Sequence, residues 1–402
     1  MDSPAMSTVE LHTPAPLRPR TRELRRPPRT RLDPYPRDPT ARWLLRLGFS
    51  VPFLIAAFIS SANPTPLGAS RNAQLAEHVL TIPWNSVDAT WLSTIYPPIS
   101  SLLAAVTPGG RLGLGILGAL LAGVLLQRVL TILVQRRVPK STTVILMLAL
   151  AGNPLFFFMA IENLPAFLGL AFFGNALTHV VRFVVWGNTQ SGFRAGLLMM
   201  LAALSDLSGL LYVATAALAS PFLQHSRAHQ PGARRANVLV IVYPTVGALA
   251  SIILLNLIFL GRPAGPLGRE LIQGSGERLS TLVGIFGTPT GWLLLAPVVS
   301  AWMIALIVHR PGAIIVSSLV FLALLGAYVV GLLPPGSAGN TYIMMILLAI
   351  ALIPTARTPI TNILVDIVAV AQIVIAWMTA IDRPIVQEWM NSIGAVLLGQ
   401  LH

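Results

Sequence analysis

Residues 112–134 read LGLGILGALLAGVLLQRVLTILV, an apolar run that decides the fold class of this chain. A helix needs about 20 such residues to cross a hydrocarbon core of about 30 Å, because each residue advances it by about 1.5 Å. Arg136, Arg137 and Lys140 follow the run directly. Since basic residues collect in cytoplasmic loops, we expect this end of the span to face the cytoplasm.

Similar runs recur along the chain, of which 54% is hydrophobic and only 10% is charged. We therefore predict an all-α polytopic membrane protein with about nine or ten transmembrane helices. The other predicted spans cover residues 44–62, 143–161, 164–185, 236–260, 290–308, 313–333, 342–356 and 359–380. They place the transmembrane domain at residues 44–380 and leave a C-terminal tail at residues 381–402.

The chain is strongly basic, with a formal net charge of +13 at pH 7. Many of its 27 lysines and arginines lie before the first span, and most of the others flank apolar runs. Membrane topology explains this distribution better than a nucleic-acid partner does. The chain has no cysteine, which excludes a disulfide framework and a thiolate nucleophile, and its sequence indicates no cofactor or metal.

Residues 1–43 are rich in arginine and proline and show no apolar periodicity, so they cannot form a core. We expect a disordered cytoplasmic tail that is attracted to anionic lipid, with docking of a partner as the alternative. The small residues Ser60, Ser61 and Ala62 resemble a signal-peptidase cleavage site. The long tail ahead of span 44–62 favours an uncleaved anchor.

Segment 195–223 is too long for a simple span and carries the sequence SDLSG at residues 205–209. If it crosses the membrane, the basic loop 225–235 lies outside. If it forms two half-helices that enter and return, broken at Asp206 and Gly209, that loop stays cytoplasmic. We favour the second arrangement, which obeys the distribution of positive charge and places the C-terminal tail outside.

The loop of residues 63–111 is then extracytoplasmic and carries Glu77, Trp84, Asp88, Trp91 and Tyr96. Short helices at the membrane interface are expected here, where tryptophan and tyrosine are also common for purely amphipathic reasons. A carboxylate at the membrane surface can act as a base on a substrate carried by lipid. Asp88 is the candidate base and the three aromatic residues are candidate substrate contacts, while a helix cap or a solvated acid is the alternative for Asp88.

Four short motifs connect this loop with the following spans: YPPISSLL at 96–103, NPLF at 153–156, ENL at 162–164 and FRAGLL at 193–198. The arrangement resembles the GT-C superfamily of integral membrane glycosyltransferases over residues 44–260. The resemblance implies a polyprenyl phosphate sugar as donor and an acidic base in the first outer loop, a role that falls on Asp88. Many members have an Asp-Glu pair where this chain has Ser70, Arg71 and Asn72. Glu77 is therefore the second candidate base, and an inactive relative is the alternative.

Three arginines, Arg262, Arg269 and Arg278, lie in an outer loop, against the usual distribution of positive charge. The leaving group of the implied reaction is a phosphate, which a guanidinium binds through two parallel hydrogen bonds. We take these arginines as candidate phosphate ligands. The alternative is a solvated loop balanced by Glu270 and Glu277.

Ionisable residues inside predicted spans are costly and therefore informative. His179 and Arg182 are expected to snorkel toward the cytoplasmic face. Asp206 is expected to pair with Arg194 or Arg182, or else to line the reaction cavity as a substrate contact. Asp366 is read as a structural acid.

The function expected from these patterns is transfer of a sugar from polyprenyl phosphate to an extracytoplasmic glycan or glycolipid acceptor. Sparse lysine with abundant alanine and arginine indicates a GC-rich bacterial genome, so we expect the protein in the bacterial plasma membrane. A transporter or lipid flippase, which also uses broken helices and polar groups at depth, is one alternative. A catalytically inactive GT-C-like scaffold is the other.

Overall fold

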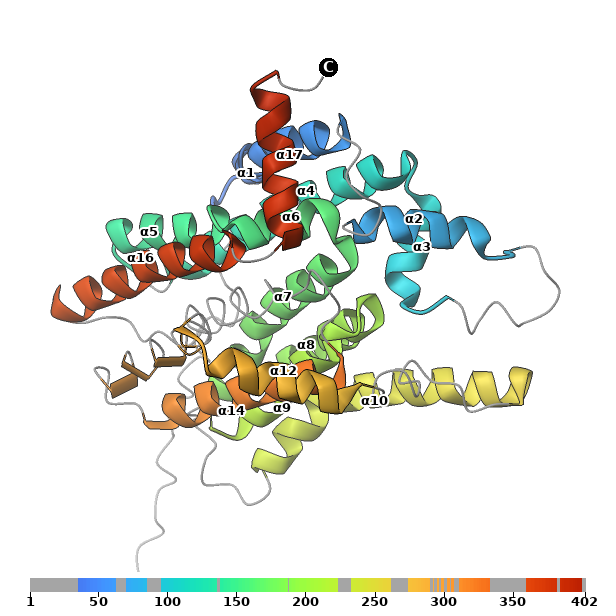
Figure 1. Ribbon diagram of the computed structural model, residues 1–402. Helices are drawn as coiled ribbons and strands as arrows, with labels where there is room; N and C mark the ends of the chain where they lie inside the picture. Colours follow the sequence, from blue (N-terminus) through green and yellow to red (C-terminus); the bar gives the residue numbers. More distant parts are fainter. Residues whose placement is uncertain are drawn as a thin grey trace, which may run out of the picture. The chain divides into compact units, whose positions relative to one another are not determined.

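The computed structural model describes residues 35–62, 70–84, 95–135, 138–186, 188–222, 233–261, 274–289, 311–332, 359–381 and 384–399, with isolated positions between 292 and 306. Every regular element within these ranges is a helix, as the sequence predicts (Figure 1). Predicted span 290–308 is represented only by isolated positions, and predicted span 342–356 lies outside the described residues.

The first two long helices, α1 (Pro39–Ala62) and α4 (Gly110–Gln135), correspond to predicted spans 44–62 and 112–134. The Asp38 carboxylate accepts a hydrogen bond of 2.9 Å from the Ala41 N–H and so caps the start of α1. A Cβ atom added to Gly123 of α4 would lie 2.3 Å from the carbonyl oxygen of Arg46 in α1. Glycine therefore lets the two backbones approach closely, as is common where membrane helices pack.

Predicted span 143–161 is not one straight helix. It is divided into α5 (Lys140–Ala151) and α6 (Pro154–Glu162), which are bent by 51° relative to each other. The Asn153 side chain accepts a hydrogen bond of 2.9 Å from the Leu155 N–H and caps α6. Pro154 occupies the first turn of α6. Backbone N–H groups have no intrahelical partner at this position, so the N–H that proline lacks is not missed. A cap followed by proline is a helix start signal, so these two residues explain the break.

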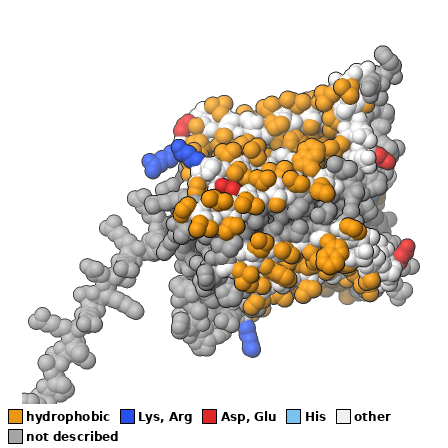
Figure 2. Space-filling view, turned by 60° about the vertical axis from the view of Figure 1, so that its left-hand side comes forward, with side chains coloured by type: hydrophobic (Ala, Val, Ile, Leu, Met, Phe, Trp, Pro, Cys, Tyr) orange, Lys and Arg blue, Asp and Glu red, His pale blue; other side chains and the backbone are white. Residues whose placement is uncertain are grey.

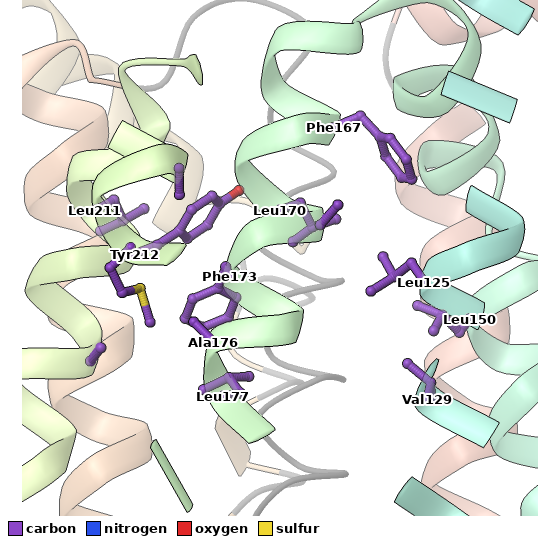
Figure 3. Packing of buried hydrophobic residues seen from close by; sticks show 14 of the residues in the cluster. Leu125, Val129, Leu150, Phe167, Leu170, Phe173, Ala176, Leu177, Leu211 and Tyr212 are labelled. Carbon is purple, nitrogen blue, oxygen red and sulfur yellow. The ribbon is translucent and has the colours of Figure 1, made fainter. Parts of the chain in front are cut away.

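Helix α7 (Leu164–Trp186) is the centre of the main hydrophobic core. Figure 3 shows it between α4 on one side and α9 (Ser208–Ala219) on the other. Phe156 and Phe167 meet edge to face with ring centroids 5.4 Å apart, while Phe173 stacks on Tyr212 at 4.8 Å. These contacts fix α7 against α6 through Phe156 and against α9 through Tyr212.

Segment 195–223 is broken at Asp206, as predicted, although its first helix begins earlier. Helix α8 (Thr189–Ser205) is capped by Asp206, and α9 begins two residues after Asp206, followed by the 3₁₀ turn η2 (Ser220–Phe222). A Cβ atom on Gly209 would lie 2.1 Å from the Ala202 carbonyl oxygen, so only glycine allows the first turn of α9 to pack on the last turn of α8. The break is therefore a tightly packed turn inside the helix cluster.

The remaining helices are α2 (Arg71–Thr81), α3 (Pro98–Val106), α10 (Ala233–Leu260), α12 (Ser275–Phe286), α14 (Pro311–Val330), α16 (Pro359–Ile381) and α17 (Pro384–Leu397). Helix α2 is one of the short helices expected in the first loop. Helix α17 lies in the segment that the sequence assigns to a tail. Figure 1 shows it against α1 and α6, where the Trp389 side chain is buried.

Three described helices are long and apolar enough to cross a membrane: Pro39–Ala62, Gly110–Val134 and Arg235–Leu260. The bent pair of α5 and α6 gives a fourth if it is one span. Figure 2 shows a face on which hydrophobic side chains cover most of the described surface and charged ones lie mainly near the edges. In α10, Leu239 is 65% exposed and Ile258 is also 65% exposed, which suits contact with lipid. The molecule is therefore compatible with a membrane.

The course of α7 to α10 generates a topology prediction. Helices α7 and α8 pack along each other after a short connection, and Gly196 in the first half of α8 lies against Val240 in the first half of α10. The starts of α8 and α10 are thus near each other, which favours a return of the chain through α9. We expect a cysteine replacing Gly232 to resist an impermeant maleimide in intact cells. Cysteines replacing Thr81 and Ser141 are the outer and inner controls. Labelling at Gly232 equal to that at Thr81 would overturn the re-entrant arrangement.

Candidate functional site

The start of α3 lies on the break between α8 and α9. The Tyr96 hydroxyl donates a hydrogen bond of 2.9 Å to the Ala203 carbonyl oxygen, and the buried Ser100 hydroxyl donates one of 2.6 Å to the Ser205 carbonyl oxygen. Both carbonyls belong to the last turn of α8, where no intrahelical N–H is available. Two side chains from the YPPISSLL motif therefore complete the hydrogen bonding of the interrupted helix.

Asp206 occupies the break itself, with 4% of its surface exposed. Its Oδ2 atom accepts a hydrogen bond of 3.0 Å from the Ser208 backbone N–H and a second one from the Ser208 hydroxyl. The carboxylate thus lies at the start of α9, where the positive end of the helix dipole favours an anion. Gly169 of α7 approaches the same point, since a Cβ atom there would lie 3.9 Å from the Asp206 Cβ.

The expected ion pair of Asp206 with Arg194 or Arg182 is wrong. Arg111 and Glu162 form the only ion pair among the described residues. Arg194 precedes Asp206 by twelve residues in α8, which separates their backbones by about 18 Å along the helix. The Asp206 carboxylate is instead stabilised by local hydrogen bonds from Ser208.

The electrostatics of this site connect Tyr96 with Asp206. Burial, and then the negative charge of Asp206, raise the pKa of the Tyr96 hydroxyl well above its ordinary value. Tyr96 therefore keeps its proton across the physiological range and remains a hydrogen-bond donor. The structure brings together Tyr96 and Asp206, which the sequence proposed separately.

Other predicted site residues lie elsewhere or make different contacts. Glu77 is exposed on α2, opposite the buried face that carries Leu75. Trp84 is 36% exposed and donates its indole N–H to the Val79 carbonyl oxygen at 3.1 Å, near the end of α2. Arg278 of α12 donates from Nε to the Val329 carbonyl oxygen at 2.9 Å, near the end of α14. Asp88, Trp91, Arg262 and Arg269 lie outside the described residues.

A buried polar network that the sequence did not predict joins α1, α4, α6 and α17. Arg111 binds Glu162 through two parallel hydrogen bonds, from Nε to Oε2 at 3.0 Å and from Nη2 to Oε1 at 2.7 Å. The Ser60 hydroxyl donates to Glu162 and accepts from the Trp389 indole N–H at 3.1 Å. The sequence feature that could have predicted this network is the pair of opposite charges, Arg111 and Glu162, at the predicted outer ends of two neighbouring spans.

Asn72 holds the adjacent junction between α6 and α7. Its side-chain N–H donates to the Ile161 carbonyl oxygen at 2.6 Å, and its side-chain oxygen accepts from the Leu164 N–H at 2.7 Å. A single amide thus satisfies one backbone group on each side of the junction. Helix α2 is thereby anchored to the bundle through its buried face.

Among the described residues, no three histidine, aspartate or glutamate side chains are grouped as metal ligands. No protein-family model matches the chain, and neither the curated proteins nor the solved structures contain a significant match. The resemblance to the GT-C superfamily therefore remains an interpretation of the four motifs.

The Arg111–Glu162 pair generates a stability prediction. Glu162→Gln should lower the free energy of unfolding by about 3 kcal/mol, because it leaves a largely buried guanidinium without its counter-charge. Denaturant unfolding of the detergent-solubilised protein measures this change. Glu77→Gln, on the exposed face of α2, is the matched control and should change stability by less than about 0.5 kcal/mol. The double variant Arg111→Met, Glu162→Leu should recover most of the loss, since it removes both charges. Equal stability of Glu162→Gln and the control would show that the pair contributes nothing.

Proposed function

We propose that the protein is a bacterial plasma-membrane glycosyltransferase that uses a polyprenyl phosphate sugar as donor and an extracytoplasmic glycan or glycolipid as acceptor. One observation supports it above the others: Tyr96 and Ser100, from the loop predicted to carry the catalytic base, are bonded to an interrupted helix that holds a buried carboxylate. Interrupted backbone at membrane depth is tolerated where it is buried in protein or lines a water-filled cavity, and the buried break at Asp206, covered by the start of α3, is proposed to support such a cavity.

In the proposed reaction, Asp88 removes the proton of the acceptor hydroxyl as its oxygen attacks the anomeric carbon. The bond from that carbon to the phosphate oxygen breaks, and the phosphate leaves with the electron pair. General-base assistance of this kind contributes on the order of 10² to 10⁴ in rate. Trp84 and Trp91 are proposed to stack on the sugar or its lipid, since aromatic rings suit the membrane interface.

Tyr96 and Asp206 are proposed as positioning residues. The neutral Tyr96 hydroxyl fixes the end of the catalytic loop to the Ala203 carbonyl oxygen, and Asp206 keeps the following turn in place through Ser208. Arg262, Arg269 and Arg278 are proposed to bind the donor phosphate. The hydrogen bond from Arg278 Nε to Val329 fixes the plane of its guanidinium, which favours a directional contact.

Transport or lipid flipping is the second candidate function, and the two helix breaks favour it. Helices α5 and α6 are interrupted at Asn153, and α8 and α9 at Asp206. Transporters use such discontinuous helices to present helix ends to a substrate near the middle of the membrane. A catalytically inactive scaffold is the third, motivated by Ser70, Arg71 and Asn72 in place of an Asp-Glu pair. Transfer of radiolabelled sugar by purified protein separates the first function from the others.

The base is tested by Asp88→Asn, which keeps the shape of the side chain and removes its basicity. Sugar transfer from a radiolabelled polyprenyl phosphate sugar should fall at least tenfold, in line with the contribution expected of a general base, of about 10² or more. Glu77→Gln is the matched control and should retain activity. Retention of activity by Asp88→Asn together with loss in Glu77→Gln would assign the base to Glu77.

Phosphate binding is tested by replacing Arg262, Arg269 and Arg278 individually with alanine. Titration of polyprenyl phosphate should show a large loss of affinity at one position and small losses at the others, because only a desolvated, bidentate contact escapes screening by solvent. Lysine at the sensitive position should restore binding only in part, since it returns the charge without the geometry. Three unchanged affinities would move the phosphate site away from this loop.

A further inference from the structure

A group of basic residues, three arginines and one histidine, lies within the bundle at the end opposite the Arg111–Glu162 pair. Arg128 is on α4, His179 and Arg182 are on α7, and Arg194 is on α8. By residue count, each lies about 6 to 11 Å from the end of its helix that is predicted to be cytoplasmic. The four side chains therefore share a common depth on three adjacent helices.

The side chains are close enough for their charges to act on one another. His179 experiences the charges of Arg182, Arg128 and Arg194, and Arg182 experiences those of Arg128 and Arg194. Arg182 is only 8% exposed, so it packs inside the bundle and does not snorkel to the surface as the sequence suggested. Arg128 and His179 are partly buried, while Arg194 is exposed at the edge of the group.

The group has no described counter-charge. None of its members forms an ion pair with any described carboxylate. Three of its buried nitrogen atoms, Arg128 Nε, His179 Nδ1 and Arg182 Nε, also have no hydrogen-bond partner among the described residues. Buried polar groups are normally paired, and buried like charges repel one another, so such an arrangement is stable only if an anion is supplied.

We propose that Arg128, His179, Arg182 and Arg194 form a binding site for a phosphate-bearing ligand. Guanidinium groups match the geometry of phosphate oxygens and release water more readily than lysine does, which suits a site between helices. The exposed Arg194 provides the side from which the anion enters. Lipid headgroups and soluble phosphate share this chemistry. The site is separate from the outer-loop site and does not depend on the glycosyltransferase proposal.

The test uses the full-length protein in detergent with three probes: short-chain phosphatidic acid, inorganic phosphate, and a short-chain diacylglycerol without phosphate. Affinity is measured by titration at fixed ionic strength. Arg194→Gln is the first variant, because its side chain is exposed and its loss should not disturb packing. Arg182→Lys is the second, since it keeps the charge and removes the planar fork. Lys140→Gln, an exposed cation at the start of α5, is the control with the same change in charge.

Wild type and Lys140→Gln should bind phosphatidic acid equally, with no binding of diacylglycerol. Arg194→Gln and Arg182→Lys should each weaken binding about tenfold or more, the loss expected for one charge-assisted contact. Binding of phosphatidic acid alone identifies a lipid headgroup, whereas similar binding of inorganic phosphate identifies a soluble ligand. The proposal would be overturned if the protein bound neither phosphatidic acid nor inorganic phosphate. Equal affinities of wild type, Arg194→Gln and Arg182→Lys would also overturn it.

Discussion

Buried backbone groups that lose their helical partners must find others within the protein, because an unpaired buried N–H or C=O group is costly. The structure meets this requirement at three described interruptions with specific side chains. Asn153 caps α6, Asn72 bridges the junction of α6 and α7, and Tyr96 with Ser100 completes the end of α8. The short helices α2 and α3 are held in place by these bonds, so their positions depend on the interrupted helices that they contact.

The two ends of the bundle differ in whether their buried charges are neutralised within the protein. At the end near α2, Arg111 and Glu162 neutralise each other within a network that also includes Ser60 and Trp389. At the other end, cations from α4, α7 and α8 gather without a described acid. A buried ion pair is self-sufficient, whereas a group of like charges needs a partner from outside. This contrast distinguishes a structural polar site from one that is built to bind a ligand.

The proposed chemistry requires a rigid support beneath a reactive loop. The contact between the start of α3 and the break at Asp206 provides this support. Tyr96 remains protonated, so the hydrogen bond from its hydroxyl to the Ala203 carbonyl oxygen is maintained. The same break would also serve a transporter, because an interrupted helix presents its ends to a substrate in either case. What favours sugar transfer is the connection of the break to a long loop carrying acidic and aromatic residues, which alternating access does not require.

The sequence by itself determined the helical class and the position of most described helices, because the length of an apolar run and the residues that end it are local properties. It also located the break at Asp206, and it contained the Asn153-Pro154 signal for the break that we did not predict. Only the tertiary structure decided that Asp206 bonds to Ser208 instead of a distant arginine, that Arg111 reaches Glu162, and that Arg182 is buried beside Arg128. The bond from Ser208 to Asp206 is local, but the contacts of Arg111 with Glu162 and of Arg182 with Arg128 join different helices. They depend on how the helices approach one another, which glycines such as Gly123 and Gly209 permit and which composition alone does not fix.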